Sequence, residues 1–373
     1  MSLINFHVPR CCFYLILIAI IRAGTDFIRN IDNFKNDFKN PFFRSFIMFF
    51  SQIFAIFLFF LQKFYYKNVF FEGNEYSIEK KYIFNFYYIM IWVSLMVFLG
   101  NFTFRNLIYN YTMKKINTIF LENFELLMLF LSYFFIESNL LKIKNHRHHY
   151  IAIILCILCF IFIVIYFSFK IDKSFLVVPF ICSLLISIES QFFQSVSLTI
   201  PKKLNYEYFI NMNYILFIQG IFGIIIVVVL KILYSFFYNN NLKIFKTLLK
   251  NFFPFKLIYM VLICSLNVLN LKVIEETRPS YLAIGKGLSN FLIRISRLIQ
   301  QYYYPNKYKD LWNVINVLFD IITLLSFFIF CELITFNFCE LDKYTIQKTA
   351  DRGESDTIKE ITEFHEINFF NHI

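Results

Sequence analysis

The chain alternates long apolar segments with short polar joints over most of its 373 residues. Each apolar segment is close to the length of about 20 residues that an α-helix needs to cross a bilayer. Backbone groups in lipid must be hydrogen-bonded within the segment, so each segment is expected to be helical. The pattern predicts ten transmembrane helices, at residues 11–28, 43–62, 84–104, 115–136, 149–169, 174–198, 209–236, 252–271, 281–300 and 312–331.

Composition supports a membrane protein. Apolar residues make up 58% of the chain and aromatic residues 21%, including 54 Phe, whereas a soluble domain is about 45–50% apolar. The apolar run at 11–21 resembles the core of a signal peptide, but Arg22 and Asp26 follow it in place of a small-residue cleavage site. We therefore expect this run to remain as the first span.

The net charge of +11 is unevenly placed. Nine acidic and four basic residues lie from Glu332 onward, which leaves residues 1–331 with a net charge of +16. A basic membrane body favours anionic lipid headgroups or anionic solutes, and anchoring of loops at headgroups is the simpler explanation. The loops on the two predicted sides of the membrane hold nearly equal numbers of Lys and Arg residues. Loop charge therefore does not show which side faces the cytosol.

The ten spans divide into two sets of five at the polar joint Lys170–Lys173. This division predicts an all-α fold with a first five-span half at 1–169 and a second at 170–338. Two such halves are a common arrangement in transporters built from inverted repeats. The acidic segment 339–373 has no periodic apolar face, and it is expected to be a disordered cytosolic tail.

Polar side chains inside the spans are the candidate functional groups, because charge in a bilayer is costly and usually marks a pathway or site. Glu122 and Glu125 share one face of the fourth span at i,i+3 spacing. Glycines flank Lys286 in the ninth span, so a neighbouring helix can approach closely there. The candidate substrate-binding residues are Glu122, Glu125, Gln191, Lys286, Arg294, Arg22 and Asp26.

Simpler roles remain open for several of these residues. Arg22 and Asp26, at i,i+4 spacing, can neutralise each other. The two glutamates can be hydrated near the membrane surface, and Lys286 can extend its head group to the interface. If the fourth and ninth spans instead face each other, Glu125 and Lys286 line a common central cavity.

Two further motifs are interpreted as structural features and not as metal or redox sites. The run from His146 to His149 looks like a metal cluster, but its place between two spans predicts a solvated loop. Cys156 and Cys159 have the spacing of a redox motif, but they lie within a span, where thiols behave as small apolar groups. No metal and no other cofactor is therefore expected.

Three stretches carry a resemblance to a known family. The stretch from Met113 to Glu137, with the apolar helix beginning at His149, resembles the fourth and fifth spans of the drug/metabolite transporter superfamily. The stretch from Ser187 to Tyr206, followed by Gln219-Gly220-Ile-Phe-Gly223, resembles spans six and seven of the solute carrier 35 group, subfamily F. The chloroquine-resistance-transporter-like and nucleotide-sugar transporters are related to that group. In the third stretch, Leu271–Arg294, only Arg294 matches the family's ninth helix.

The resemblance implies a ten-helix transporter with two inverted five-helix repeats, which works by alternating access and needs no covalent chemistry. It implies cytosolic termini and an endomembrane location, such as the Golgi, an endosome or lysosome, or a vacuole. The expected solute is small and polar. A nucleotide-sugar-like or other organic anion is favoured by Lys286 and the basic body, whereas Glu122 and Glu125 favour a cation. The lipid bilayer is the other expected partner, nucleic acid is not expected, and a homodimer is left open.

Two other classes remain as alternatives. A membrane-embedded, lipid-modifying enzyme would need a polar catalytic cluster at one interface, for instance His146–His149 with an acid. A receptor or structural membrane protein would be favoured by an odd number of spans with the termini on opposite sides. A transporter that is not an enzyme is the preferred interpretation.

Overall fold

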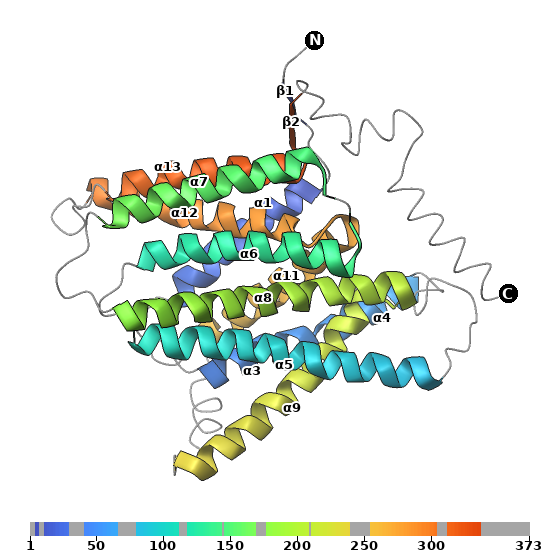
Figure 1. Cartoon of the computed structure of the whole chain (residues 1–373). Coiled ribbons are helices and arrows are strands. Elements are labelled where there is room, and N and C mark those ends of the chain that lie inside the picture. The colour runs from blue at the N-terminus through green and yellow to red at the C-terminus, as the bar shows by residue number, and fades with distance from the viewer. Residues whose placement is uncertain are drawn as a thin grey trace.

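The computed structural model has eleven helices and one short ribbon within the residues that it describes. The described residues are 4–6, 11–29, 41–65, 80–111, 118–143, 145–168, 177–208, 210–238, 254–303 and 312–336. Most helices run side by side in a bundle, and α9 lies obliquely to the others (Figure 1). The helices are α1 (Cys11–Arg29), α3 (Pro41–Ile53), α4 (Ala55–Tyr65), α5 (Lys80–Tyr111), α6 (Thr118–Leu140), α7 (Arg147–Ser168), α8 (Val177–Tyr208), α9 (Met212–Tyr238), α11 (Pro254–Glu276), α12 (Tyr281–Tyr303) and α13 (Trp312–Phe330).

Every apolar segment predicted from the sequence coincides with a helix, and the second is divided into α3 and α4 at Phe54. Within the described residues, five segments are long and apolar enough to cross a membrane. They are Phe42–Leu61, Arg147–Ile165, Ile181–Asn205, Met212–Phe236 and Leu257–Glu276. Shorter apolar segments lie in α1, α5 and α13. The described parts of α6 and α12 belong to neither group, and these helices carry four of the predicted charged residues, Glu122, Glu125, Lys286 and Arg294.

A two-stranded ribbon departs from the all-α expectation. Strands β1 (Ile4–Phe6) and β2 (Ile334–Phe336) pair antiparallel, with Ile4 opposite Phe336. The ribbon joins the segment before α1 to the segment after α13 (Figure 1). Strands of three residues are too short to give a period-two signal in the sequence. The predicted acidic tail at 339–373 lies outside the described residues.

The principal helix contacts join segments that are far apart in the chain. Helix α1 packs on α11 and α12, α3 packs on α9, and α7 packs on α13. Helix α5 packs on α8 and α9, while α6 packs mainly on α8. Aromatic side chains from α6 and α13 pack together, and the ring centroid of Phe130 lies 4.7 Å from those of both Phe327 and Phe330. The two predicted halves are therefore packed against each other throughout.

The outer surface exposes many apolar side chains, and the interior holds many polar side chains among its apolar core residues. On α7, Ile154 and Phe162 are exposed, as are Val229 and Phe236 on α9. Buried positions include many Ser, Thr, Asn and Gln side chains, with Ser187 fully buried on α8. Soluble proteins rarely expose apolar surface on this scale, whereas helices packed in lipid use small polar residues at their contacts. This distribution is compatible with an integral membrane protein.

The contact between α9 and α3 depends on two glycines. A Cβ atom built at Gly220 would lie 2.8 Å from the carbonyl oxygen of Phe49 and 3.0 Å from the backbone nitrogen of Ile53. A Cβ atom built at Gly223 would overlap the ring of Phe49, which is fully buried. Small residues let two helix backbones approach this closely.

We expect Gly220→Ala to destabilise the protein by about 1–3 kcal/mol, because the added methyl group must displace backbone atoms of α3. Gly24→Ala in α1 is the matched control, since a Cβ atom there meets nothing within 4 Å. The control should be neutral or stabilising by about 0.5–1 kcal/mol. Thermal unfolding of both variants in mild detergent measures the difference. Equal unfolding temperatures would contradict the close α3–α9 contact.

Candidate functional site

A cluster of polar side chains lies inside the bundle between α6, α8 and α12. Lys286 Nζ on α12 donates a hydrogen bond of 3.0 Å to Gln191 Oε1 on α8. The same nitrogen lies 3.5 Å from Glu125 Oε2 on α6. The side chains of Lys286 and Glu125 are only 16% and 14% exposed. The structure therefore brings together three residues that the sequence placed on three separate spans.

The two glycines beside Lys286 set the position of its helix. A Cβ atom at Gly285 would lie 2.9 Å from Ile18 on α1, and one at Gly287 would lie 2.9 Å from Leu324 on α13. Helix α12 is thus held closely on two sides, while Lys286 extends toward α6 and α8. A Lys286 side chain that extended to the lipid headgroups could not donate this hydrogen bond to Gln191.

A second polar group surrounds Arg294, two turns further along α12. Arg294 Nη1 donates to Asp320 Oδ1 on α13 at 2.6 Å, and Nη2 donates to Asn123 Oδ1 on α6 at 2.9 Å. Glu122 Oε2 lies 3.5 Å from Nη2. The side chains of Arg294 and Asp320 are 3% and 2% exposed, so this ion pair lies in the protein interior. Charged partners and an amide oxygen together offset much of the cost of burying the guanidinium.

Helices α6 and α12 run antiparallel, with polar contacts spread along them. At the far end from Arg294, Glu137 Oε1 accepts a hydrogen bond of 2.5 Å from the backbone N–H of Ser280. Ser280 directly precedes α12, where the helix dipole favours a carboxylate. On the neighbouring α8, Lys202 Nζ donates to the carbonyl oxygen of Ile274, near the end of α11, at 2.7 Å. Both contacts hold the turn between α11 and α12.

Of the other predicted residues, Arg22 on α1 is close enough for its charge to act on Lys286. The backbone of Asp26 lies in α1, but its side chain lies outside the described residues. Arg44 on α3, which was not among the predicted site residues, acts in the same way on Glu125. Basic and acidic side chains are therefore nearly balanced in the described part of the site. The basic ones are Arg22, Arg44, Lys286 and Arg294, and the acidic ones are Glu122, Glu125 and Asp320.

Sequence reasoning missed several members of the site. Asp320 is the one acidic residue within the predicted tenth span, and an intramembrane carboxylate is itself a signal. Asn123 lies between Glu122 and Glu125, and only these two charged residues of the stretch were predicted as site residues. On α8, buried polar residues recur every four positions, which places them on one helix face. They are Ser183, Ser187, Gln191, Ser195 and Thr199.

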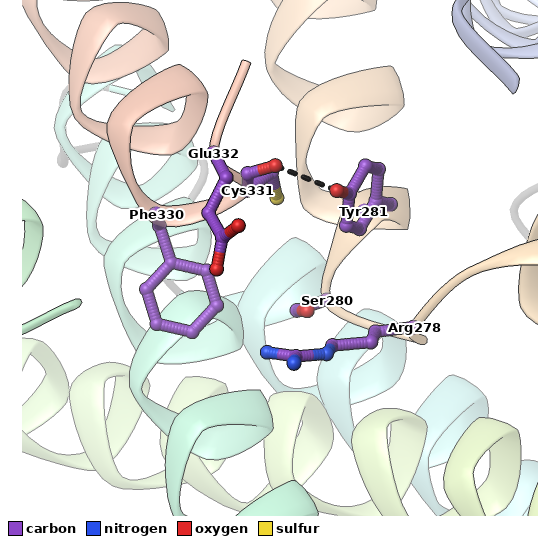
Figure 2. A pocket seen from close by; sticks show the side chains of 6 residues that line it. All are labelled: Arg278, Ser280, Tyr281, Phe330, Cys331 and Glu332. Carbon is purple, nitrogen blue, oxygen red and sulfur yellow. Dashed lines mark hydrogen bonds between the residues drawn. The ribbon is translucent and has the colours of Figure 1, made fainter. Parts of the chain in front are cut away.

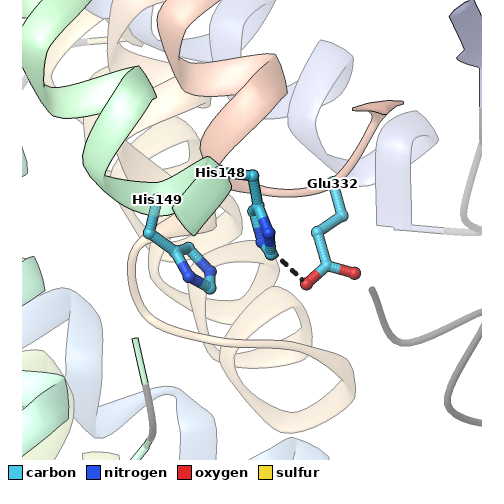
Figure 3. A group of neighbouring side chains, drawn as sticks. All are labelled: His148, His149 and Glu332. Atoms are coloured by element: carbon cyan, nitrogen blue, oxygen red, sulfur yellow. Dashed lines mark ion pairs between the residues drawn. The ribbon is translucent and has the colours of Figure 1, made fainter. Parts of the chain in front are cut away.

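The prediction of a solvated histidine loop is wrong. Arg147 to His149 form the first turn of α7, and His148 and His149 are 5% and 0% exposed. His148 Nε2 lies 3.2 Å from Oε1 of Glu332, which is the second residue after the end of α13 (Figure 3). Because α7 packs along α13, the start of one helix meets the end of the other. The sequence could not show this meeting.

A small pocket opens beside Glu332. Tyr281 donates a hydrogen bond of 2.6 Å from its hydroxyl group to the carbonyl oxygen of Cys331 across it, and Arg278 lies at its edge (Figure 2). Its other lining residues are Ser280, Phe330 and Glu332. Cys156 and Cys159 are buried free thiols within α7, in keeping with their expected structural role.

Comparison with known proteins assigns no family to the chain. No protein family matches the sequence, and no curated protein is significantly similar to it. The resemblance to drug/metabolite transporters therefore stays a prediction.

Asp320→Ala should lower the free energy of unfolding by about 3–5 kcal/mol, because it removes one partner of a buried ion pair. The double variant Arg294→Met with Asp320→Leu should recover most of this loss, because no buried charge then lacks its partner. Denaturant titration in mild detergent measures both values.

The control for this prediction is the exposed pair of Lys272 and Glu275, whose N–O distance is 2.5 Å. Glu275→Gln should change stability by less than about 1 kcal/mol, as is usual for surface ion pairs. An Asp320→Ala variant as stable as Glu275→Gln would show that Asp320 and Arg294 are not a buried pair.

Proposed function

We propose that the chain is a membrane transporter that moves a small organic anion by alternating access. The observation that carries this proposal is the position of Lys286, which is buried between Glu125 and Gln191. Ionisable groups among apolar helices are costly, and in membrane proteins they usually mark solute or ion pathways. No covalent chemistry is required of any residue in the cluster.

The pattern of helix contacts supports two five-helix repeats. Counted in order, with α3 and α4 taken as one span, each helix of the first half (1–169) has a counterpart in the second half (170–338): α1 and α8, α3 and α9, α5 and α11, α6 and α12, α7 and α13. If every helix is replaced by its counterpart, the main helix contacts are reproduced. The pair α6–α8 becomes α12–α1, α5–α8 becomes α11–α1, and α6–α7 becomes α12–α13. The contacts α3–α9 and α7–α13 map onto themselves. Transporters with repeated halves place the solute site between them, as Lys286 lies here.

Alternating access requires contacts between the halves that can open at one end at a time. Glu137 and Ser280 provide such a contact at one end of α6 and α12. Glu122 and Arg294 provide the other, where the Glu122 side chain is 37% exposed. Lys286 lies between them along α12. A solute bound there would be released to opposite sides as the two contacts open in turn.

An anionic solute suits the charge of the cluster. A phosphate or carboxylate group would bind the Lys286 amine in place of the Glu125 carboxylate, with Gln191 able to donate from its amide nitrogen. The net charge of +16 over residues 1–331 favours this exchange. Nucleotide sugars and other organic anions are therefore the first solutes to test, in an endomembrane protein with cytosolic termini.

A membrane-embedded enzyme is the second candidate, and one observation favours it. His148 and Glu332 lie next to a small pocket at one end of the bundle, where a catalytic acid–base pair would be placed. An uptake assay separates the two candidates, because only a transporter loads sealed vesicles.

Lys286→Ala should abolish uptake into proteoliposomes, while Lys286→Arg should keep part of it, because arginine retains the charge but not the compact ammonium geometry. The measurement is uptake of labelled nucleotide sugars, organic phosphates and dicarboxylates, with equal amounts of folded protein. Lys272→Ala is the control, since Lys272 is half-exposed and paired with Glu275. Normal uptake by Lys286→Ala would exclude Lys286 from the solute site.

Tags placed at residues 1 and 373 should be equally accessible from the cytosol in selectively permeabilised cells. An even number of spans puts both termini on one side, and the family resemblance places that side in the cytosol. Opposite accessibility of the two tags would rule out the ten-span topology.

A further inference from the structure

Three potential metal ligands meet at the end of the bundle away from Arg294. His148 and His149 belong to the first turn of α7, and Glu332 is the second residue after the end of α13 (Figure 3). Each residue offers one ligand atom, and these atoms all lie within 4.8 Å of one another. All three residues are buried, and Glu332 is only 8% exposed.

Buried imidazole nitrogens at this place lack hydrogen bonds. Both ring nitrogens of His148 and Nε2 of His149 are buried with no hydrogen-bond partner among the described residues. His148 Nε2 lies at an ion-pair distance of 3.2 Å from Glu332 Oε1, but without the alignment of a hydrogen bond. Native proteins rarely leave several buried polar atoms unsatisfied, and a missing ion is one physical reason for such a group.

The backbone at Glu332 gives an independent reason to expect a function for its carboxylate. Glu332 has a φ of 59°, in the left-handed region. Its N–H donates to the carbonyl of Ile329, and the N–H of Leu333 donates to that of Phe328. This is a Schellman motif, in which glycine usually occupies the place of Glu332. A side chain with a Cβ atom is strained in this conformation.

We propose that His148, His149 and Glu332 bind a divalent transition-metal ion, such as Zn²⁺, which joins the start of α7 to the end of α13. Two imidazole nitrogens and one carboxylate oxygen are a common ligand set for zinc and leave one coordination position open. The pocket lined by Arg278 and Ser280 reaches Glu332 (Figure 2) and gives access to the ion. The positive charge of Arg278 opposes a bare cation and favours an anion as the fourth ligand.

The tautomer of neutral His149 lowers the affinity of the proposed site for a metal ion. The backbone N–H of His146 donates to His149 Nδ1 at 2.9 Å, so neutral His149 carries its proton on Nε2. Binding a metal through Nε2 requires that proton on Nδ1 instead. Metal binding at His149 therefore replaces one backbone hydrogen bond with a coordination bond, while His148 and Glu332 bind without this exchange.

The test uses the full-length chain in mild detergent, treated with a chelator and then titrated with Zn²⁺ by calorimetry. Wild-type protein should bind the ion with a raised thermal unfolding temperature, and Co²⁺ should give the absorption of a site of low coordination number. Glu332→Gly should be at least as stable as wild type without metal, because glycine suits the left-handed backbone. It should bind Zn²⁺ at least about 100-fold more weakly, since loss of a group that merely supports a ligand already costs about 10–100-fold.

Two further variants complete the experiment. His148→Ala should lose Zn²⁺ binding to the same extent, whereas His146→Ala should keep it, because the ring of His146 is not one of the three ligands. Wild-type binding in Glu332→Gly, or no effect of Zn²⁺ on the unfolding temperature of the wild type, would overturn the proposal. The site does not depend on the proposed transport activity, and neither readout measures transport.

Discussion

The cost of burying charge among apolar helices constrains the whole structure. Helix α6 carries buried acidic groups and helix α12 carries buried basic groups, and neither has the hydropathy of a membrane span in its described residues. An isolated charge in a low-dielectric interior is strongly unfavourable unless a partner lies beside it. The two helices are therefore suited to the centre of the bundle, where each supplies the charges that the other lacks.

The surrounding helices make this pairing possible. Gly285 and Gly287 bring α12 close to α1 and α13, and the α13 contact brings Asp320 to Arg294. On the other side, α6 packs on α8, which supplies Gln191. The positions of Lys286 and Arg294 thus depend on small residues in the helix contacts as much as on their charged partners.

The helices could be predicted from the sequence because lipid requires long apolar segments with internal hydrogen bonds. The cluster around Lys286 could be proposed for a related reason, since charges in such segments stand out. Its distances could not be predicted, because they depend on which helices pack together. The pair Arg294–Asp320 joins two spans through a contact that no local pattern reveals, although Asp320 itself could have been predicted as a carboxylate within a span.

The burial of the histidines is a second feature that depends on which helices pack together. His146 to His149 have the composition of a polar loop, and only the contact between α7 and α13 buries His148 and His149 against Glu332. The β1–β2 ribbon likewise joins two segments more than 300 residues apart in the chain, a separation over which residue patterns carry no information.

In the proposed transport cycle, the antiparallel arrangement of α6 and α12 would let α12 tilt about Lys286. Ser280 and Arg294 lie about 9 and 12 Å from Lys286 along the helix, at a rise of about 1.5 Å per residue. A tilt of about 10° would move these two ends by roughly 2 Å in opposite directions, which is enough to break a hydrogen bond. The central amine would hardly move. A small rotation about one ion pair would therefore open the contact at one end of the bundle while the contact at the other end stays formed.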